Sequence, residues 1–215
     1  KDGHIPHSRV VEREEFLSSY HSGFFGMDRH GLFYTYGKMC IKLYRREFLL
    51  SSRPAPSGLR YAEDQLFNLQ VFPRAERIAV LAKEYIYKFG GVTGNLSLSL
   101  FDDMLRLHSL KLTLTDREDW KKSELGAFLN NVRSFLATLA VSGKLKADGM
   151  PQALEKLNAS SIWRHALEAH PARDDAFLSA MRRNDAAAAY AELSRHTFLK
   201  KIAYRLRRIL LRLVR

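Results

Sequence analysis

The sequence lacks several features that would assign it to a protein class at once. Among its 215 residues is one cysteine, Cys40, which excludes an intrachain disulfide and is typical of a reducing compartment. No run of eighteen apolar residues occurs, so no transmembrane helix is expected. The first residues have no apolar core and do not resemble a signal peptide. Since the chain does not begin with Met, we expect a processed product or a fragment.

Signatures of several catalytic classes are also missing. There is no glycine-rich P-loop, no Ser/His/Asp signature and no zinc-finger spacing. His4 and His7 could supply one pair of metal ligands, but two ligands do not make a site. Three acidic pairs in the second half of the chain lie at helices or helix starts and are interpreted as helix caps and solvated faces. They are Asp102-Asp103, Asp116 with Asp119, and Asp174-Asp175.

Acidic residues are absent after Glu192, which makes the charge of the chain uneven. The net charge of +12 predicts an anionic partner such as nucleic acid, phospholipid or a phosphorylated substrate. Seven Lys and Arg residues follow His196, which leaves +5 on residues 1–195. The basic character is therefore mostly a property of the C-terminal tail.

The tail, residues 198–215, combines an apolar stripe with a basic one. This composition is typical of an interfacial helix at an anionic membrane, where each Lys or Arg contributes about 1 kcal/mol. The predicted membrane-binding residues are Lys200, Lys201, Arg205, Arg208 and Arg212. The alternative is a terminal helix docked on the domain. Nucleic-acid binding is not expected, because the stripe is too apolar and no recognition fold precedes it.

The residues that are present predict a mixed first half and a helical second half. Hydrophobic residues make up 46% of the chain, which is enough for a packed core. In the first half we expect helices over residues 9–22 and 62–74, a helical turn within 43–50, a loop over 51–58 and a strand over 77–89. In the second half we expect helices over residues 100–114, 121–141, 151–170 and 174–194.

An acidic pair, Glu63-Asp64, opens the helix expected over residues 62–74. It follows a segment rich in basic and aromatic residues over 36–48, called the basic-aromatic segment below. Two carboxylates at a helix start can simply compensate the helix dipole, and residue type alone favours that interpretation. The other interpretation is a general base that accepts the proton of a hydroxyl group. The basic pair Arg45-Arg46 in this segment also has a structural interpretation, as a helix face exposed to solvent.

The acidic pair belongs to a series of linked motifs over residues 36–95. In order, they are Gly37-Lys38-Met39, LYRREFL (43–49), GLRY-x-ED-x-x-FN (58–68), IAVL (78–81) and YIYKF (85–89). This series resembles the later half of family-2 glycosyltransferases with the GT-A fold. In that family a "GKLYRR-F" segment precedes a "Y-ED--F" motif, whose Asp is the expected base of an inverting transfer.

The resemblance implies roles for individual residues. Asp64 would be the catalytic base, and Glu63 would position the acceptor or hold Asp64. The implied substrate-binding residues are Lys38, Tyr87, Lys88 and Thr93. Lys88 stands where many relatives carry an Arg near the diphosphate, and Lys supplies charge without the bidentate fork. Thr93 lies in the Gly90–Gly94 segment, which is either the family's mobile loop or an ordinary turn after a strand.

One part of the family pattern is not found in the sequence. Family members begin with a nucleotide-binding half, whose Asp-x-Asp-type motif binds a divalent metal and the donor diphosphate. The resemblance thus implies Mg or Mn, with ligands that this sequence does not reveal. The expected fold is α/β: an incomplete GT-A-type (Rossmann-like), acceptor-side half over residues 1–98, a helical region over 99–197 and a basic amphipathic helix over 198–215.

The resemblance, together with the basic tail, therefore implies a bacterial inverting glycosyltransferase that makes cell-surface polysaccharide. It would move a sugar from a nucleotide sugar to a saccharide or lipid-linked acceptor, as a peripheral protein at the cytoplasmic face of the membrane. The alternative is a non-catalytic, helical membrane-surface or scaffold module that retains a degenerate transferase half.

Overall fold

The computed structural model describes residues 8–25, 39, 42–56, 58–81, 96–171, 175–195 and 197–198. Within these residues the chain is mostly helical. It divides into two compact units. Unit 1 comprises Lys1–Gly91 and Arg106–Glu124, and unit 2 comprises Val92–Leu105 and Leu125–Arg215. The α/β fold with a GT-A-type half and the domain boundaries expected from the sequence remain predictions.

Unit 1 contains an antiparallel pair of strands, β1 (Arg9–Glu12) and β2 (Arg77–Val80), with Val11 opposite Ile78. Val11 is fully buried while its neighbour Val10 is half exposed, so one face of the pair meets the core. The helix expected over residues 9–22 is therefore wrong at its start. The chain becomes helical only after β1, through α1 (Arg13–Glu15), a π-helix (Phe16–Tyr20) and a 3-10 helix (His21–Phe25).

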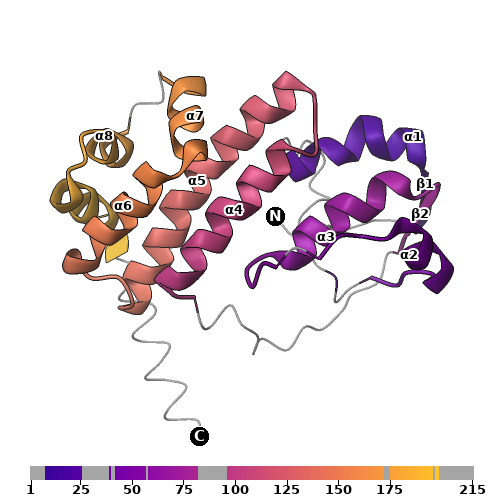
Figure 1. Ribbon diagram of the computed structural model, residues 1–215, viewed down its shortest axis with the longest axis horizontal. Coiled ribbons are helices and arrows are strands. Elements are labelled where there is room, and N and C mark those ends of the chain that lie inside the picture. The colour runs from indigo at the N-terminus through magenta and orange to yellow at the C-terminus, as the bar shows by residue number, and fades with distance from the viewer. Residues whose placement is uncertain are drawn as a thin grey trace, which may run out of the picture. The chain divides into compact units, whose positions relative to one another are not determined.

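Two further helices of unit 1 confirm the sequence prediction. Helix α2 (Arg46–Ser52) begins within the basic-aromatic segment and ends at Ser52, so the loop expected over residues 51–58 is wrong at its first two residues. Helix α3 (Glu63–Val71) continues as a 3-10 helix over Phe72–Arg74 (Figure 1). Pro73 occupies the first turn of that 3-10 helix, where a missing N–H costs nothing. Helix α3 buries Leu66, Leu69 and Val71. Of the strand expected over 77–89, residues 77–80 are confirmed and those after Leu81 lie outside the described residues.

The core of unit 1 is rich in aromatic rings. Its buried members are Val11, Phe16, Phe24, Phe25, Leu59, Leu66, Leu69, Phe72, Leu107 and Trp120. His21 lies among them, with ring centroids 5.3 Å from Trp120 and 5.6 Å from Phe25. Its Nδ1 has no hydrogen-bond partner among the described residues. Because burial disfavours the charged imidazolium, the pKa of His21 is lowered to about 4.

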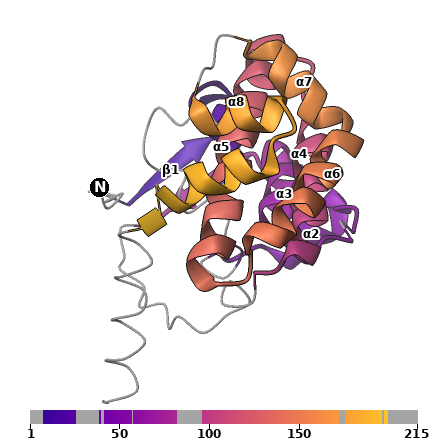
Figure 2. The same ribbon diagram turned by 90° about the vertical axis from the view of Figure 1, so that its left-hand side faces the viewer.

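The secondary structure of unit 2 is helical wherever the structure describes it. Figures 1 and 2 show α6 (Met150–Ala159), α7 (Ser161–Ala169) and α8 (Ala176–Arg182) around the part of α5 (Glu118–Ser142) that belongs to this unit. Phe128 of α5 meets Trp163 of α7 edge-on at 6.4 Å. A further helix covers residues 186–195. None of the helices in the described part of the chain is long and apolar enough to cross a membrane.

The helix positions in the second half are largely those expected. Helix α4 (Phe101–Leu112) and α5 confirm the first two predictions. The single helix expected over 151–170 is wrong, because Ser160 adopts an extended conformation between α6 and α7. The single helix over 174–194 is also wrong: α8 ends at Arg182, and Asn184 has a left-handed backbone with φ 57°.

Candidate active site

The acidic pair of the sequence motif lies in the first turn of α3. Ala62 precedes the helix in a left-handed conformation (φ 54°), and no side chain caps the helix. Glu63 is exposed, whereas Asp64 is half-buried. The Oδ1 atom of Asp64 accepts a hydrogen bond from the backbone N–H of Gln65 at 2.8 Å. The helix start therefore holds one partly sheltered carboxylate beside one that is open to solvent.

Tyr44 connects the basic-aromatic segment to this helix. Its hydroxyl donates a hydrogen bond to Oδ1 of Asn68, one turn after Asp64. Its ring meets Phe67 edge-on, with centroids 5.6 Å apart, and lies 6.5 Å from Phe72. Burial is the main cause that raises the pKa of the Tyr44 hydroxyl, and the negative charge of Asp64 raises it further. Tyr44 therefore remains a neutral donor at physiological pH.

Asn68 is the most buried polar residue of this group, with an exposed fraction of 0%. Its Nδ2 has no hydrogen-bond partner among the described residues. Sequence reasoning assigned no role to Tyr44 or Asn68, although both stand inside the quoted motifs. The signal that could have found Asn68 is an amide four residues after Asp64, next to the core residue Leu69.

The described basic residues near α2 lie mainly at the surface. Arg45 and Arg46 are exposed, which agrees with the solvated face expected for this pair. Arg74 donates a hydrogen bond to the backbone oxygen of Ser52, at the end of α2. Lys42 places its ammonium 5.8 Å from the centre of the Phe72 ring. These cations supply positive charge on unit 1.

The other predicted site residues lie outside the described residues. These are Lys38, Tyr87, Lys88 and Thr93 for the substrate, and Lys200, Lys201, Arg205, Arg208 and Arg212 for the membrane. The same holds for His4, His7 and Cys40. Among the described side chains, no group of three His, Cys, Asp or Glu residues could hold a metal ion. The described side chains therefore do not fit the divalent metal that the resemblance implies. The metal itself remains a prediction.

A second group of ionisable side chains is buried between α4 and α5, in the part of both helices that belongs to unit 1. Glu124 Oε1 lies 2.5 Å from His108 Nδ1, and Glu124 Oε2 lies 2.6 Å from Lys111 Nζ. All three side chains are almost fully buried. Burial works to raise the pKa of Glu124, but the Lys111 charge and the His108 hydrogen bond outweigh it and lower the pKa. Burial lowers the pKa of His108, although Glu124 opposes it.

This buried triad was also missed by sequence reasoning. His108 and Lys111 are three residues apart and therefore share the face of α4 that carries Leu107. Two basic residues on a buried helix face need a buried acid, which is the signal that could have revealed them. With such low exposure the triad has no surface to offer a substrate, and its chemistry is that of a structural ion network.

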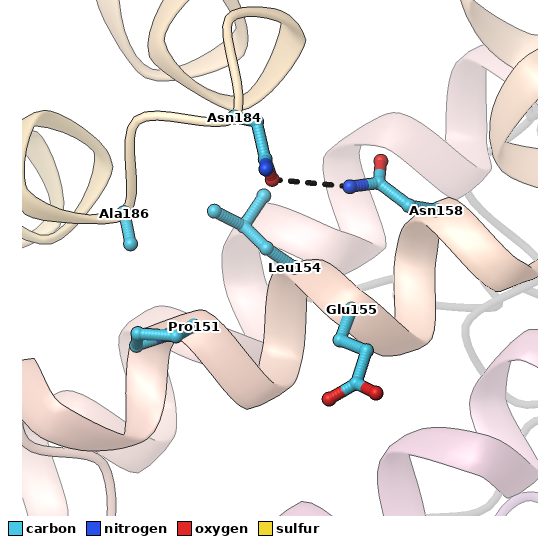
Figure 3. A pocket seen from close by; sticks show the side chains of 6 residues that line it. All are labelled: Pro151, Leu154, Glu155, Asn158, Asn184 and Ala186. Carbon is cyan, nitrogen blue, oxygen red and sulfur yellow. Dashed lines mark hydrogen bonds between the residues drawn. The ribbon is translucent and has the colours of Figure 1, made fainter.

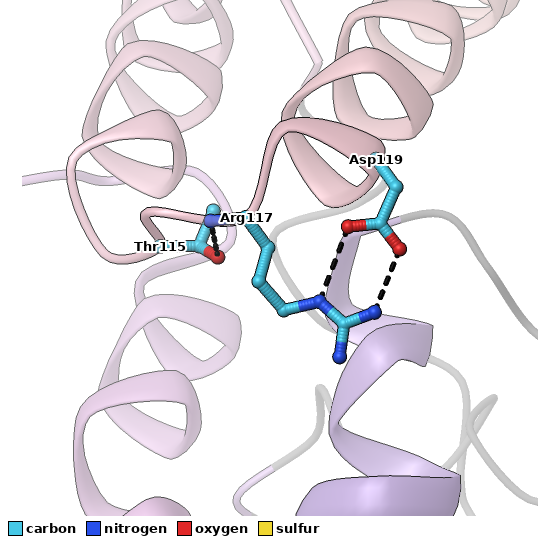
Figure 4. A network of polar contacts seen from close by, with 3 residues as sticks. All are labelled: Thr115, Arg117 and Asp119. Carbon is cyan, nitrogen blue, oxygen red and sulfur yellow. Dashed lines mark hydrogen bonds and ion pairs between the residues drawn. The ribbon is translucent and has the colours of Figure 1, made fainter.

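The turn between α4 and α5 is held by local polar contacts (Figure 4). Arg117 grips Asp119 with two hydrogen bonds of 3.1 and 2.7 Å, and its backbone N–H bonds Thr115 Oγ1 at 3.2 Å. The guanidinium also lies 4.5 Å from the ring centre of Trp120. Asp119 thus serves the start of α5. In unit 2, Asp175 accepts a hydrogen bond from the N–H of Leu178 and confirms the cap expected at α8.

Unit 2 contains a shallow hollow of about 290 Å³ beside α6 (Figure 3). Its lining consists of Pro151, Leu154, Glu155, Asn158, Asn184 and Ala186. Asn158 Nδ2 donates to Asn184 Oδ1 at 3.1 Å across it. One exposed carboxylate and two amides bonded to each other do not form a catalytic set. The turn of α3 with Asp64 therefore remains the strongest candidate site.

Comparison with known proteins relates the chain to a sugar-transferring enzyme. The chain is 31% identical over 145 residues to poly(ribitol-phosphate) beta-N-acetylglucosaminyltransferase TarS of Staphylococcus aureus, in strains MW2 and Mu50. The chain is thus related to a glycosyltransferase. The similarity covers 64% of this chain but only 24% of TarS, so the chain spans about a quarter of the relative's length. No family model matches the chain, and no solved structure matches it significantly.

Proposed function

We propose that this chain carries the acceptor side and the general base of an inverting glycosyltransferase with a GT-A-type fold. The observation that supports the proposal is the first turn of α3, where Asp64 is half-buried and Glu63 is exposed, in a chain related to a glycosyltransferase. A base needs access to the acceptor and partial shelter from water, and the half-buried position of Asp64 is compatible with both. Glu63 would face the acceptor from the same turn.

In the proposed reaction, an acceptor hydroxyl attacks the anomeric carbon of a nucleotide sugar. Asp64 takes the hydroxyl proton while the new carbon–oxygen bond forms. The bond to the nucleotide diphosphate breaks on the opposite face of the sugar, and the diphosphate leaves with the bonding electrons. Attack from the opposite face inverts the anomeric centre. The negative charge that develops on the leaving diphosphate calls for cations, and Lys38 and Lys88 are proposed for this role.

The substrates are proposed as a nucleotide-activated amino sugar and an acceptor polymer that carries phosphate. The name of TarS states an N-acetylglucosaminyl group as cargo and poly(ribitol phosphate) as acceptor. Residues 1–195 carry a net charge of +5, which suits an anionic acceptor. We further propose that residues 198–215 keep the protein at the cytoplasmic face of an anionic membrane, since seven of the basic residues follow His196.

Replacement of the predicted base tests the reaction. In the full-length protein, Asp64→Asn should lower the transfer rate by at least about a hundredfold, because a positioned base contributes that much or more. Nucleotide-sugar binding, measured by calorimetry, should stay near the wild-type value. The control is Glu14→Gln, which removes an exposed carboxylate of α1 and should leave the transfer rate near the wild-type value. Near-normal turnover by Asp64→Asn would rule out the base assignment.

A further inference from the structure

The first turn of α3 is poorly held by its own sequence. Its N-cap residue, Ala62, has φ 54°, a region that is unfavourable for residues with a Cβ atom. Ala62 also has no side chain that could accept a hydrogen bond from the first N–H groups of the helix. A strained and uncapped helix start needs support from elsewhere in the fold. This is the turn that carries Glu63 and Asp64.

Tyr44, which belongs to a different segment of the chain, contacts the next turn of α3. The Tyr44 hydroxyl bonds Asn68, and its ring packs edge-on against Phe67, both in the second turn of α3. Phe72 contacts the same ring from the end of the helix. Asp64 and Asn68 are four residues apart in α3, so their side chains lie on the same face of the helix. Tyr44 therefore contacts the face that also carries Asp64. The electrostatic influence of Asp64 on Tyr44 is consistent with this proximity.

The Tyr44–Asn68 pair is not explained by stability alone. Asn68 is fully buried and leaves its Nδ2 without a partner among the described residues, which is unfavourable. An apolar pair of similar shape would fill the same space without this cost. A directional hydrogen bond, however, fixes the rotation and height of a helix turn in a way that apolar packing does not.

We propose that Tyr44 is a positioning residue, which holds the first turn of α3 through Asn68 and Phe67 and so sets the direction of the Asp64 carboxylate. Its effect on catalysis rests on the proposed function of Asp64. Tyr44 itself takes no part in proton transfer, because its hydroxyl is committed to Asn68. A displacement of the base by a fraction of an ångström is enough to slow transfer, since catalytic geometry is exacting.

Two variants of the full-length protein test this role. Tyr44→Phe removes the hydroxyl. The double variant Tyr44→Phe/Asn68→Leu removes the whole polar pair and restores apolar packing, so it should melt no lower than wild type. Leu66, whose N–H bonds the carbonyl of Ala62, and Phe67 are the protected amides that close the first turn of α3, and we expect their hydrogen exchange to rise about tenfold in both variants. We expect kcat to fall about tenfold with KM for the nucleotide sugar within about twofold. Tyr190→Phe in unit 2 is the matched control.

The two readouts separate this proposal from the proposed function. If exchange at Leu66 and Phe67 is unchanged in both variants, Tyr44 does not hold the turn and the proposal is wrong. If exchange rises but kcat stays at the wild-type value, Tyr44 is structural only, and its positioning role is wrong. If the wild-type protein transfers no sugar, or Asp64→Asn remains active, the proposed function fails. A rise in exchange would then still establish that Tyr44 holds the turn.

Discussion

At the scale of single residues, the ion network of Glu124 is the most sensitive feature of unit 1. Its carboxylate contacts His108 on one oxygen and Lys111 on the other, and all three groups are shielded from water. A buried pair of this kind adds little net stability over apolar residues, but removal of one partner leaves an uncompensated charge. The network is therefore a point at which one substitution can unfold the unit.

Lys111→Met tests this network. The variant should lose roughly 3–5 kcal/mol of unfolding free energy, because Glu124 would stay buried without its ammonium partner. Urea unfolding followed by circular dichroism measures the loss. The control is Lys121→Met, which removes the ammonium that contacts Glu118 at 2.8 Å on the exposed side of α5. The Lys121 variant should unfold almost as wild type does; equal losses in both variants would contradict the burial argument.

His21 should make unit 1 sensitive to mild acid. Its pKa is about 4 in the folded protein and about 6.5 when unfolded, so the unfolded state binds the proton more readily. Its neutral form is accommodated above pH 6.5. As pH falls from 6.5 towards 4, the unfolding free energy should drop by roughly 3 kcal/mol, because the folded and unfolded pKa values of His21 differ by about 2.5.

Melting curves between pH 4 and 7 measure this effect. In the variant His21→Leu, most of the pH dependence in that range should disappear. The remainder should come from His108, whose pKa burial also lowers and which therefore acts in the same direction. An unchanged pH slope in His21→Leu would show that another group causes the acid sensitivity.

The sequence could place Asp64 but not the residues around it. The acidic pair was recognisable because it stands at a helix start and within a linked series of motifs. Tyr44 and Asn68 are 24 residues apart, and their contact depends on how α2 and α3 are joined. The triad of His108, Lys111 and Glu124 depends on two helices that meet at particular faces. Spacing along one helix cannot give either contact.

At the scale of elements, the start of α3 can be relieved of strain. Ala62→Gly should raise the unfolding free energy by up to about 1 kcal/mol, because glycine adopts a left-handed backbone without a Cβ clash. The control is Ala191→Gly, at an exposed position of the helix over 186–195, which should lower it by about 1 kcal/mol. Thermal unfolding measures both changes. A loss of stability in Ala62→Gly would contradict the left-handed conformation of residue 62.

Elements with strong local signals were predicted well, and those set by distant contacts were not. The long α5 begins and ends near its expected bounds because its apolar residues repeat with helical spacing. Residues 9–12 were expected to be helical, but they form β1 because Val10 and Val11 pair with β2, far along the chain. No Gly or Pro marks the break between α6 and α7 at Ser160, and the apolar residues keep helical spacing across it. The sequence therefore predicted one continuous helix there.

At the scale of the whole molecule, the basic tail gives a test of the proposed location. Deletion of residues 198–215 removes seven basic residues and no acid, and should strongly lower co-sedimentation with vesicles that contain anionic lipid. Vesicles of neutral lipid are the control, and high salt should weaken wild-type binding. Unchanged binding after the deletion would favour the alternative in which the tail docks on the protein.

The discontinuity of unit 1 has a consequence for the order in which the protein folds during synthesis. Leu107 and Trp120 complete the core of this unit, yet they follow residues 92–105, which belong to unit 2. At about 5–20 residues per second, the ribosome needs several seconds to pass from Gly91 to Glu124. Until then the nascent aromatic cluster around Phe25 lacks its partners, so chaperone contact is expected in this interval rather than after release.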